Sequence, residues 1–150
     1  MSLKRIGVAW LFGLALSLTV PGVYAESSQD FGDYVIHYNA LATDMLTPEV
    51  AREFHITRSQ NIGMVNITVL KKVLGSPGQP VHARVEATAT NLTGQTRKIR
   101  MREVRDGNAI YYIGQFGVTN EETVKLNARV QPQGNPSEFK VEFSQDFYTH

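Results

Sequence analysis

The sequence contains no cysteine, and this absence excludes several kinds of protein at once. Without thiols the chain can form no disulfide, hold no thiolate-bound metal and offer no cysteine nucleophile. A bacterial lipoprotein anchor, which needs a cysteine just after the cleavage point, is not expected either. The core must therefore hold without crosslinks. A chain of this size can achieve this, because it buries roughly two thirds of its unfolded surface.

A strong net charge and an apolar run long enough to span a membrane are also missing. The formal charge is +1 at pH 7, and removing Lys4 and Arg5 with a leader would change it to −1 (+1 − 2). No strongly charged partner is indicated by this balance. The one long apolar run without charge, Ile6 to Val20, is short for a membrane span, which needs roughly 20 apolar residues. No second run follows, so no span is expected after the leader.

The apolar run does have the pattern of a secretory signal peptide. Two basic residues, Lys4 and Arg5, precede it, Pro21 and Gly22 end it, and Val23–Ala25 places small residues where signal peptidase reads. We therefore predict that residues 1–25 are cleaved on export. Secreted animal domains of this size usually carry disulfides, so their absence favours a bacterial periplasm. An uncleaved membrane anchor is the alternative.

The remaining residues, 26–150, suit a single domain built from strands. Apolar residues occupy every second position of Val81–Ala89, so its side chains alternate between two sheet faces. The same period runs through Thr123–Val130 and Glu138–Phe147, although Gln145 interrupts the last. Four further segments are predicted to be strands: Asp33–Asn39, Ile62–Leu74, Arg97–Arg105 and Ala109–Phe116.

One short helix is predicted near residues 48–54. Thr47 can cap its start, and Pro48 suits its first position because proline has no N–H to leave unpaired there. Val50 and Phe54 are four residues apart and would share one face of the helix.

About seven strands with alternating faces predict an all-β protein, an antiparallel β-sandwich of immunoglobulin-like type. A small β-barrel is the alternative. A parallel sheet is disfavoured, because its strands read as continuous apolar runs. An antibody-type domain is excluded, because there is no cysteine pair and no tryptophan after the leader.

Four segments of the chain carry a family resemblance: Tyr34–Ala40, Ile56–Ser59, Asn91–Gln95 and Phe143–Tyr148. In their order and spacing the chain resembles a small family of exported gamma-proteobacterial proteins classed as a domain of unknown function. The resemblance covers nearly all of residues 26–150. It implies location and size, and it implies no chemistry.

The clearest functional indication is apolar. Large apolar groups stand on both faces of Ile110–Ile113, and Tyr34–Tyr38 is similar. One face can fill the core. The other is either covered by the helix near 48–54 and its loops, or exposed as a tyrosine-bearing patch for a partner. We hypothesise a non-enzymatic envelope module that binds through Tyr38, Tyr111 and Tyr112.

Basic residues suggest a polar rim for that surface. Lys98, Arg100 and Arg102 share parity on one predicted strand and could hold an anionic envelope ligand or an acidic protein. In this hypothesis Arg100 and Arg102 form the polar rim of the tyrosine-bearing binding surface. Alternatively, these charges protect a strand edge from unwanted pairing. Nucleic acid is not expected, because no aromatic platform is interleaved with the charges.

Two other function classes stay open. The first is a small periplasmic hydrolase or metal-dependent enzyme around His55, Arg58 and Ser59, which requires these side chains to converge in a pocket. The chain has no G-x-S-x-G elbow, and its four histidines lack the spacing of a metal motif, so no catalytic residue, metal site or cofactor is predicted. The second is a structural or chaperone-like protein that uses a free sheet edge.

Overall fold

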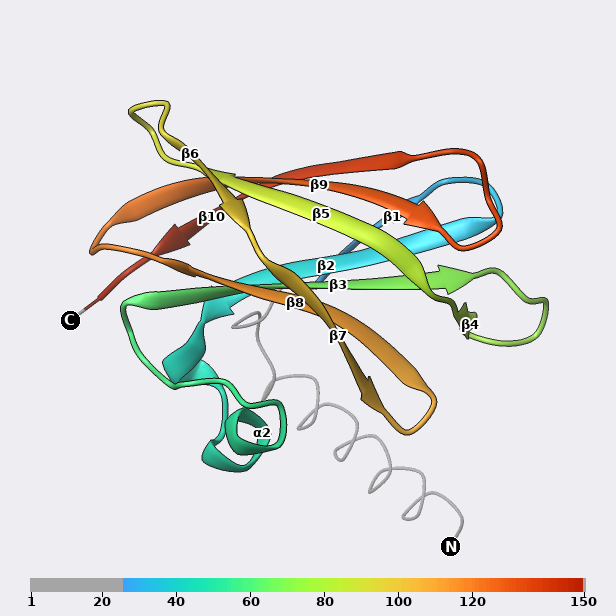
Figure 1. Cartoon of the computed structure of the whole chain (residues 1–150), viewed down its shortest axis with the longest axis horizontal. Helices are drawn as coiled ribbons and strands as arrows, with labels where there is room; N and C mark the ends of the chain where they lie inside the picture. The colour runs from blue at the N-terminus through green and yellow to red at the C-terminus, as the bar shows by residue number, and fades with distance from the viewer. Residues whose placement is uncertain (1–25, 150) are drawn as a thin grey trace, which may run out of the picture.

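The computed structural model describes residues 26–149, which form two antiparallel β-sheets packed face to face (Figure 1). We call the six-stranded sheet, ordered β1-β2-β3-β8-β7 with β4 paired to β3, sheet A. Sheet B has four strands in the order β10-β9-β5-β6. The predicted signal peptide, residues 1–25, lies outside the described residues.

Along the chain, β1 to β4 belong to sheet A, β5 and β6 to sheet B, β7 and β8 to sheet A, and β9 and β10 to sheet B. Sheet A contains β1 (Ser27–Asp30), β2 (Tyr34–Ala42), β3 (Ile62–Lys71), β4 (Gln79–Pro80), β7 (Met101–Asp106) and β8 (Ala109–Gly117). Sheet B contains β5 (Ala83–Thr90), β6 (Thr96–Ile99), β9 (Glu122–Pro132) and β10 (Phe139–Phe147). The 3₁₀ turn η1 (Thr43–Met45) and the helix α2 (Pro48–Glu53) lie between β2 and β3.

The strand order confirms an immunoglobulin-like sandwich. The path β2-β3-β8-β7 corresponds to the A-B-E-D sheet of that fold, and β10-β9-β5 corresponds to its G-F-C sheet. β6 adds a fourth strand beside β5, while β1 and β4 add short pairings to sheet A. The small-barrel alternative is wrong for residues 26–149, because their strands divide into two separate sheets.

The predicted strand Arg97–Arg105 is in fact two strands. β6 pairs with β5 in sheet B, the chain leaves the strand conformation at Arg100, and β7 then pairs with β8 in sheet A. Gly114 of β8 lies beneath this passage, where an added Cβ would stand 2.5 Å from Ile99 Cγ2 and 2.6 Å from Met101 Sδ. A side chain at Gly114 would therefore push the crossing strand away from the sandwich.

The main core lies between the sheets, on the faces that the two-residue alternation predicts. Ile36, Ile67 and Val124 are completely buried there. Burying an aliphatic side chain of this size contributes about 1.5–3 kcal/mol to stability, which makes a core without crosslinks sufficient. Phe116 and Phe147 add an edge-to-face contact between the two sheets, with ring centroids 5.6 Å apart.

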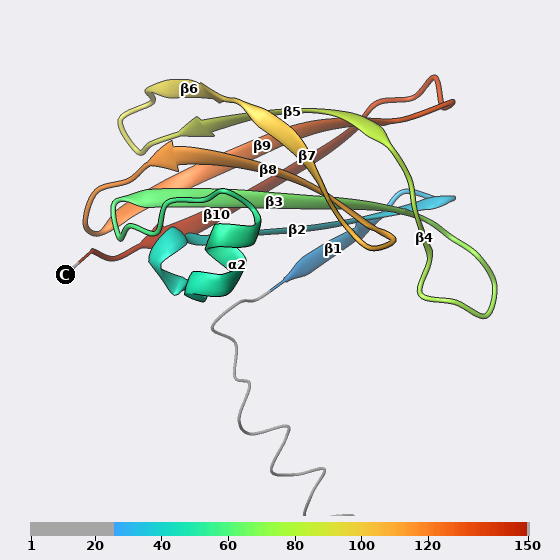
Figure 2. The same cartoon turned by 60° about the horizontal axis from the view of Figure 1, so that its bottom comes forward.

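A second, smaller apolar cluster lies on the outer face of sheet A, where η1, α2 and their loops cover it (Figure 2). Its buried members are Leu41, Ala51, Ile56, Met64 and Ile113. The short predicted helix is confirmed. It begins at Pro48, and Thr47 Oγ1 accepts a hydrogen bond from the Val50 N–H at 3.2 Å.

The end of α2 also has a local cause. His55 takes the left-handed conformation with φ of 56°, and the Ile56 N–H donates to the Ala51 carbonyl at 2.7 Å. This is the usual way in which a helix is terminated and the chain turned back. Within residues 26–149 no helix is long and apolar enough to cross a membrane.

Candidate functional site

A cavity of about 290 Å³ lies between α2 and the outer face of sheet A. Its floor comes from β2, β3 and β8, with β7 at one side, and its roof from α2 and the adjoining loops. The lining is mostly apolar: Leu41, Leu46, Val50, Phe54, Ile56, Met64, Val104, Tyr111 and Ile113, together with Asn39 and Asn66. The volume lies near the lower end of the range for small-molecule sites and is roughly twice that of a cavity that holds benzene.

Strand register explains why these side chains meet. Asn39 of β2 stands opposite Asn66 of β3, and Asn66 stands opposite Ile113 of β8. Arg102 of β7 completes this row, because it pairs with Ile113. Residues two positions apart on one strand share a face, so Leu41, Met64 and Tyr111 belong to the neighbouring rows of the same surface.

Asn39 and Asn66 are the two amide side chains in the mostly apolar floor of the cavity. Their amide oxygens are buried from solvent, and neither accepts a hydrogen bond within the described part of the chain. A buried acceptor without a partner costs about 1–3 kcal/mol, which makes such groups rare in folded proteins. Each amide can rotate about its Cβ–Cγ bond, so either its oxygen or its NH₂ group can meet a group in the cavity.

No charged side chain is among the described residues that line the cavity. Tyr111 is its one titratable group, and the Tyr111 ring packs against Phe54 of the roof with centroids 6.1 Å apart. An ion in this space would lose its hydration without gaining a counter-charge from the walls, which is costly. The cavity therefore suits a neutral, largely apolar molecule.

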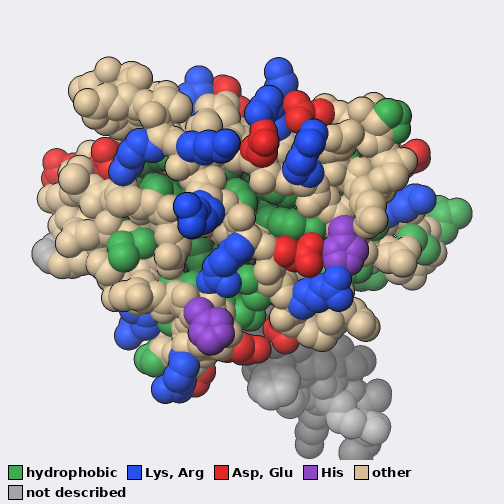
Figure 3. All heavy atoms as spheres, in the orientation of Figure 1, with side chains coloured by type: hydrophobic (Ala, Val, Ile, Leu, Met, Phe, Trp, Pro, Cys, Tyr) green, Lys and Arg blue, Asp and Glu red, His purple; other side chains and the backbone are tan. Residues whose placement is uncertain are grey.

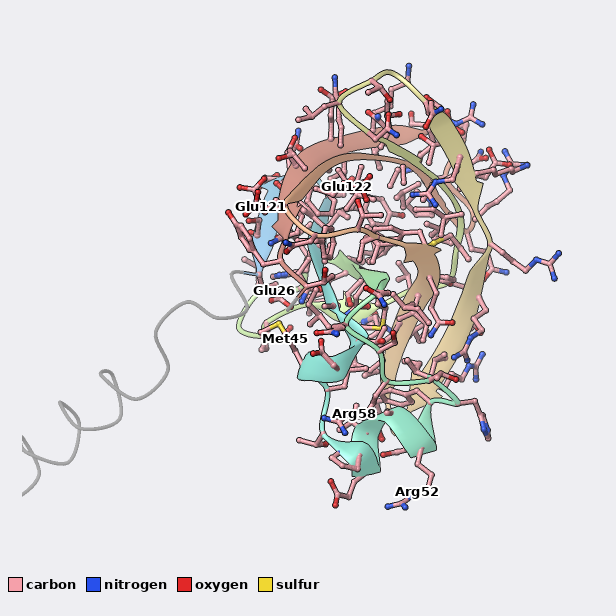
Figure 4. All side chains as sticks on the ribbon, turned by 90° about the vertical axis from the view of Figure 1, so that its left-hand side faces the viewer. Glu26, Met45, Arg52, Arg58, Glu121 and Glu122 are labelled. Atoms are coloured by element: carbon pink, nitrogen blue, oxygen red, sulfur yellow. The ribbon has the colours of Figure 1, made fainter. Side chains whose placement is uncertain are left out.

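Two arginines hold the roof in place. Arg102 donates from β7 to the carbonyl of Phe54, at the end of α2. On the other side, Arg58 donates to the carbonyls of Leu46 at 2.8 Å and Asp44 at 2.9 Å. Figure 4 shows Arg58 lying against the loop beside α2, whereas Arg52 extends away from the molecule.

A buried threonine fixes the base of the same loop. Thr43 is fully buried, and its hydroxyl donates to the Thr57 carbonyl at 2.8 Å. It also accepts from the Ser59 N–H at 2.8 Å. The loop that covers the cavity is thus fastened at its start, by Thr43, and at the end of its helix, by Arg102.

These contacts change the interpretation of His55, Arg58 and Ser59, considered above as an enzyme site. His55 is exposed and terminates α2. Arg58 holds the roof, and the Ser59 hydroxyl accepts from the Asn61 N–H at 3.0 Å. The observed role of the three residues is to shape the loop, so the expectation that they form a catalytic pocket is not supported by their placement.

Tyr112 is not part of an exposed patch, which corrects the expectation for this residue. It is only 5% exposed because β8 turns its even-numbered residues towards the core. Its hydroxyl accepts from the Ala83 N–H of sheet B at 2.7 Å and donates to Glu103 Oε1 at 2.8 Å. Burial raises the pKa of Tyr112 to about 12.

The carboxylate of Glu103 gathers further partners at the same margin of the sandwich. His82 Nδ1 donates to Glu103 Oε1 at 2.8 Å, and Arg105 donates to His82 Nε2 at 2.8 Å. The hydrogen bond from His82, followed by that from Tyr112, holds the pKa of Glu103 below its usual value. This network ties β5 to β7 and β8, and so joins the two sheets.

Tyr38 and Tyr111 also lie apart from each other, on opposite faces of sheet A. Tyr38 faces the main core, where its ring lies 4.7 Å from that of Phe143. Tyr111 faces the cavity. The three predicted tyrosines therefore do not form one surface; the covering of the outer face by α2, which the sequence offered as the alternative, is what the structure shows.

The predicted basic stripe is divided as well. Lys98 lies in β6 of sheet B, Arg102 lies in β7 of sheet A, and Arg100 is the exposed residue between them. Figure 3 shows Lys and Arg side chains spread over the face that β5 to β8 cross in Figure 1. Arg102 retains a role near the site through its hydrogen bond to the roof.

Within residues 26–149, β10 has a strand edge without a ladder partner, as expected for a chaperone-like role. β10 is nine residues long and forms ladder pairs with β9, at one side of sheet B. Its exposed positions include Lys140, Glu142 and Asp146. Charged side chains of this kind discourage a second strand from pairing with an edge.

Comparison with known proteins places the chain in a family. The profile of the family described as "Domain of unknown function (DUF4426)" matches residues 28–150. The chain belongs to the DUF4426 family. This confirms the resemblance noted in the sequence. No curated protein matches the chain.

Solved structures agree with this assignment. A DUF4426 family protein from Pseudomonas aeruginosa PAO1 is 31% identical, with a TM-score of 0.72, over 83% of this chain and 96% of that one. FetP from uropathogenic Escherichia coli strain F11, expressed recombinantly in the periplasm, is similar at 9% identity and a TM-score of 0.58, over 83% and 95% of the two chains. A copper-bound FetP variant gives 9% and 0.59, over 85% and 92%. At 9% identity the similarity to FetP establishes a shared fold and nothing more.

Proposed function

We propose that this DUF4426 domain is an exported, periplasmic, non-enzymatic binding module that takes a small, largely apolar ligand into the cavity beneath α2. The observation that carries the proposal is the cavity itself, about 290 Å³ with apolar walls, in a sandwich whose main core has completely buried side chains. Preformed concave sites with apolar walls and few polar groups are typical of small-molecule binding.

The proposal narrows the hypothesis drawn from the sequence. Tyr111 keeps a binding role as a wall of the cavity, and Arg102 supports the roof from the rim. Tyr38 and Tyr112 serve the core. The periplasm is favoured by the leader pattern and the lack of cysteine, and the fold of FetP, which was expressed in that compartment, is compatible with it.

We do not extend copper binding from the FetP variant to this domain. Within residues 26–149 no group of three or more His, Cys, Asp or Glu side chains is placed to hold a metal ion. The cavity walls also offer two amides, a phenol, the single thioether of Met64 and hydrocarbon, which suit a neutral organic molecule better than a hard or borderline cation.

The proposal is tested with a neutral fluorescent probe of two fused rings, 1-(dimethylamino)naphthalene, titrated into the processed protein. We expect saturable binding with one site per chain. Val50→Trp, which places an indole in the cavity, should weaken binding at least tenfold. Glu49→Trp adds the same ring to the exposed side of the same helix and is the matched control.

Two results would contradict the proposal. One is the absence of saturable probe binding to the wild-type protein. The other is unchanged binding by Val50→Trp when circular dichroism and thermal unfolding show that the variant and its control are equally folded.

A further inference from the structure

We infer that Asn39 and Asn66 form the polar anchor of this cavity and select a neutral ligand that carries a hydroxyl group on an apolar body; this inference rests on the proposed function. The two side chains stand directly opposite each other on β2 and β3. Cross-strand neighbours of this kind have Cβ atoms about 4.5–5.5 Å apart, so one small group can contact both amides.

The hydrogen-bonding state of the two amides favours a group that donates. Both amide oxygens are buried and lack a donor within the described residues, although the other side chains of the cavity lining are apolar apart from the phenol of Tyr111. A hydroxyl donates one hydrogen bond and accepts others, so it can meet the oxygen of one amide and the NH₂ group of its neighbour. A pure hydrocarbon would leave both oxygens unpaired.

The charge of the surroundings excludes an ionised head group. The lining contains no acidic or basic side chain. Arg102 lies in the same cross-strand row, but it is an exposed residue outside the cavity lining, and its guanidinium donates to the Phe54 carbonyl of the roof. A carboxylate or ammonium in the cavity would therefore be desolvated without a counter-charge.

The size of the space sets the apolar part. About 290 Å³ is roughly twice the volume of a cavity that takes a benzene ring, so two fused rings or a short branched chain fit beside the head group. The ligand class is thus a compact aromatic or aliphatic alcohol, in which the hydroxyl reaches the asparagine pair and the hydrocarbon contacts Tyr111, Phe54 and Met64.

The test is a matched series of three compounds that compete with 1-(dimethylamino)naphthalene for the wild-type protein: 2-naphthol, naphthalene and 2-naphthoate. We expect 2-naphthol to bind about tenfold more tightly than naphthalene, the effect of one net hydrogen bond, and 2-naphthoate to bind most weakly. Equal affinities for 2-naphthol and naphthalene, or a preference for 2-naphthoate, would overturn the inference.

Substitutions locate the effect. Asn39→Leu and Asn66→Leu should each remove most of the preference for 2-naphthol, while naphthalene binding stays the same or improves. Thr68→Val is the matched control, because Thr68 lies on the same face of β3, two positions along from Asn66 and outside the cavity lining. It should leave the preference unchanged, and a preference that survives both asparagine variants contradicts the assignment.

The series also separates this inference from the proposed function. If the fluorescent probe itself does not bind, the proposed function fails and the anchor fails with it. If the probe and both naphthalene compounds bind without discrimination, the cavity is a binding site and only the anchor is wrong. The comparison among compounds uses the wild-type protein, so it stands whether or not an asparagine variant folds.

Discussion

Sheet A presents two faces, and the same three strands, β2, β3 and β8, close them in different ways. Its inner face meets sheet B, and there Ile36 and Ile67 have no exposed surface. Its outer face meets one short helix and a loop, and there Leu41 and Met64 keep 8% and 6% exposure beside a cavity. The inner face is covered by a four-stranded sheet, whereas the outer face is covered only by a helix of six residues and loops.

The difference teaches where a small sandwich has room for a ligand. Side chains from two sheets interdigitate at crystal-like density, which leaves few voids. A helix of six residues cannot fill the pleated surface beneath it in the same way. The cavity and the two unpaired asparagine amides therefore lie under α2. If the two faces differ in packing, substitutions on them should also differ in their effect on the free energy of unfolding.

The largest loss of stability is expected from truncating a buried side chain on the inner face of sheet A. Ile67→Ala should lower the free energy of unfolding by about 2–5 kcal/mol, because it opens a cavity in a closed core. Met64→Ala on the adjoining outer face should cost clearly less, since its side chain already borders empty space. Urea unfolding of both variants measures the contrast, which disappears if Met64→Ala is as damaging as Ile67→Ala.

The link between the sheets should give the next largest effect. Tyr112→Phe removes a hydroxyl that pairs with Ala83 and Glu103, and should cost about 1–3 kcal/mol.

Stability against pH gives this variant a distinctive signature. The pKa of Tyr112 is raised from 10.0 to about 12, so the folded protein holds the phenol proton more tightly than the unfolded chain does. The contribution is fully present below pH 10 and is lost as the pH rises towards about 12. Unfolding curves across this window should show a decline that Tyr112→Phe lacks, and parallel declines in the two proteins would count against the link.

A smaller effect is expected at the roof. Arg102→Ala removes the hydrogen bond to Phe54 and should cost about 0.5–1.5 kcal/mol. Hydrogen exchange should speed up at the amides of α2 while those of β3 and β9 stay protected, because the loss is local. Uniform acceleration throughout the sandwich would show instead that the outer cover and the core unfold together.

The smallest loss of stability is expected from Arg100→Ala, which is the control for Arg102→Ala. Arg100→Ala removes the neighbouring exposed arginine between β6 and β7 and should change stability by less than about 0.5 kcal/mol. Exchange at α2 should match that of the wild-type protein. If Arg100→Ala loosens α2 as much as Arg102→Ala does, the roof responds to surface charge rather than to one hydrogen bond.

The sandwich could be predicted from the sequence because the period of two survives wherever one face of a strand is buried. Val124 to Val130 shows this plainly, and the cap Thr47 likewise identified α2. The break at Arg100 was missed because alternation continues through a strand that changes sheet. β1 was missed because its four residues are all exposed and carry no apolar face.

The candidate site could be predicted from the sequence only in part. The apolar outer residues of β8, Tyr111 and Ile113, indicated a surface that something must cover. The anchor pair was not recognised, although each asparagine lies two positions from an apolar residue of the lining, Leu41 or Met64. Asn39 and Asn66 become neighbours only through the register of β2 and β3, and the cavity depends on how incompletely a short helix covers them. Neither property is local in sequence.

The connection of residues 43–61 joins the end of β2 at Ala42 to the start of β3 at Ile62, and Ala42 is the register partner of Gly63. The two ends of this excursion are therefore held together by the ladder, whatever lies between them. Natural variation or protein engineering can lengthen, shorten or rewrite such a segment without disturbing strand order, as happens with the recognition loops of antibodies. Chimaeras that exchange this stretch between relatives should inherit the cavity roof of the loop donor, whereas a preference set by Asn39 and Asn66 should stay with the sheet.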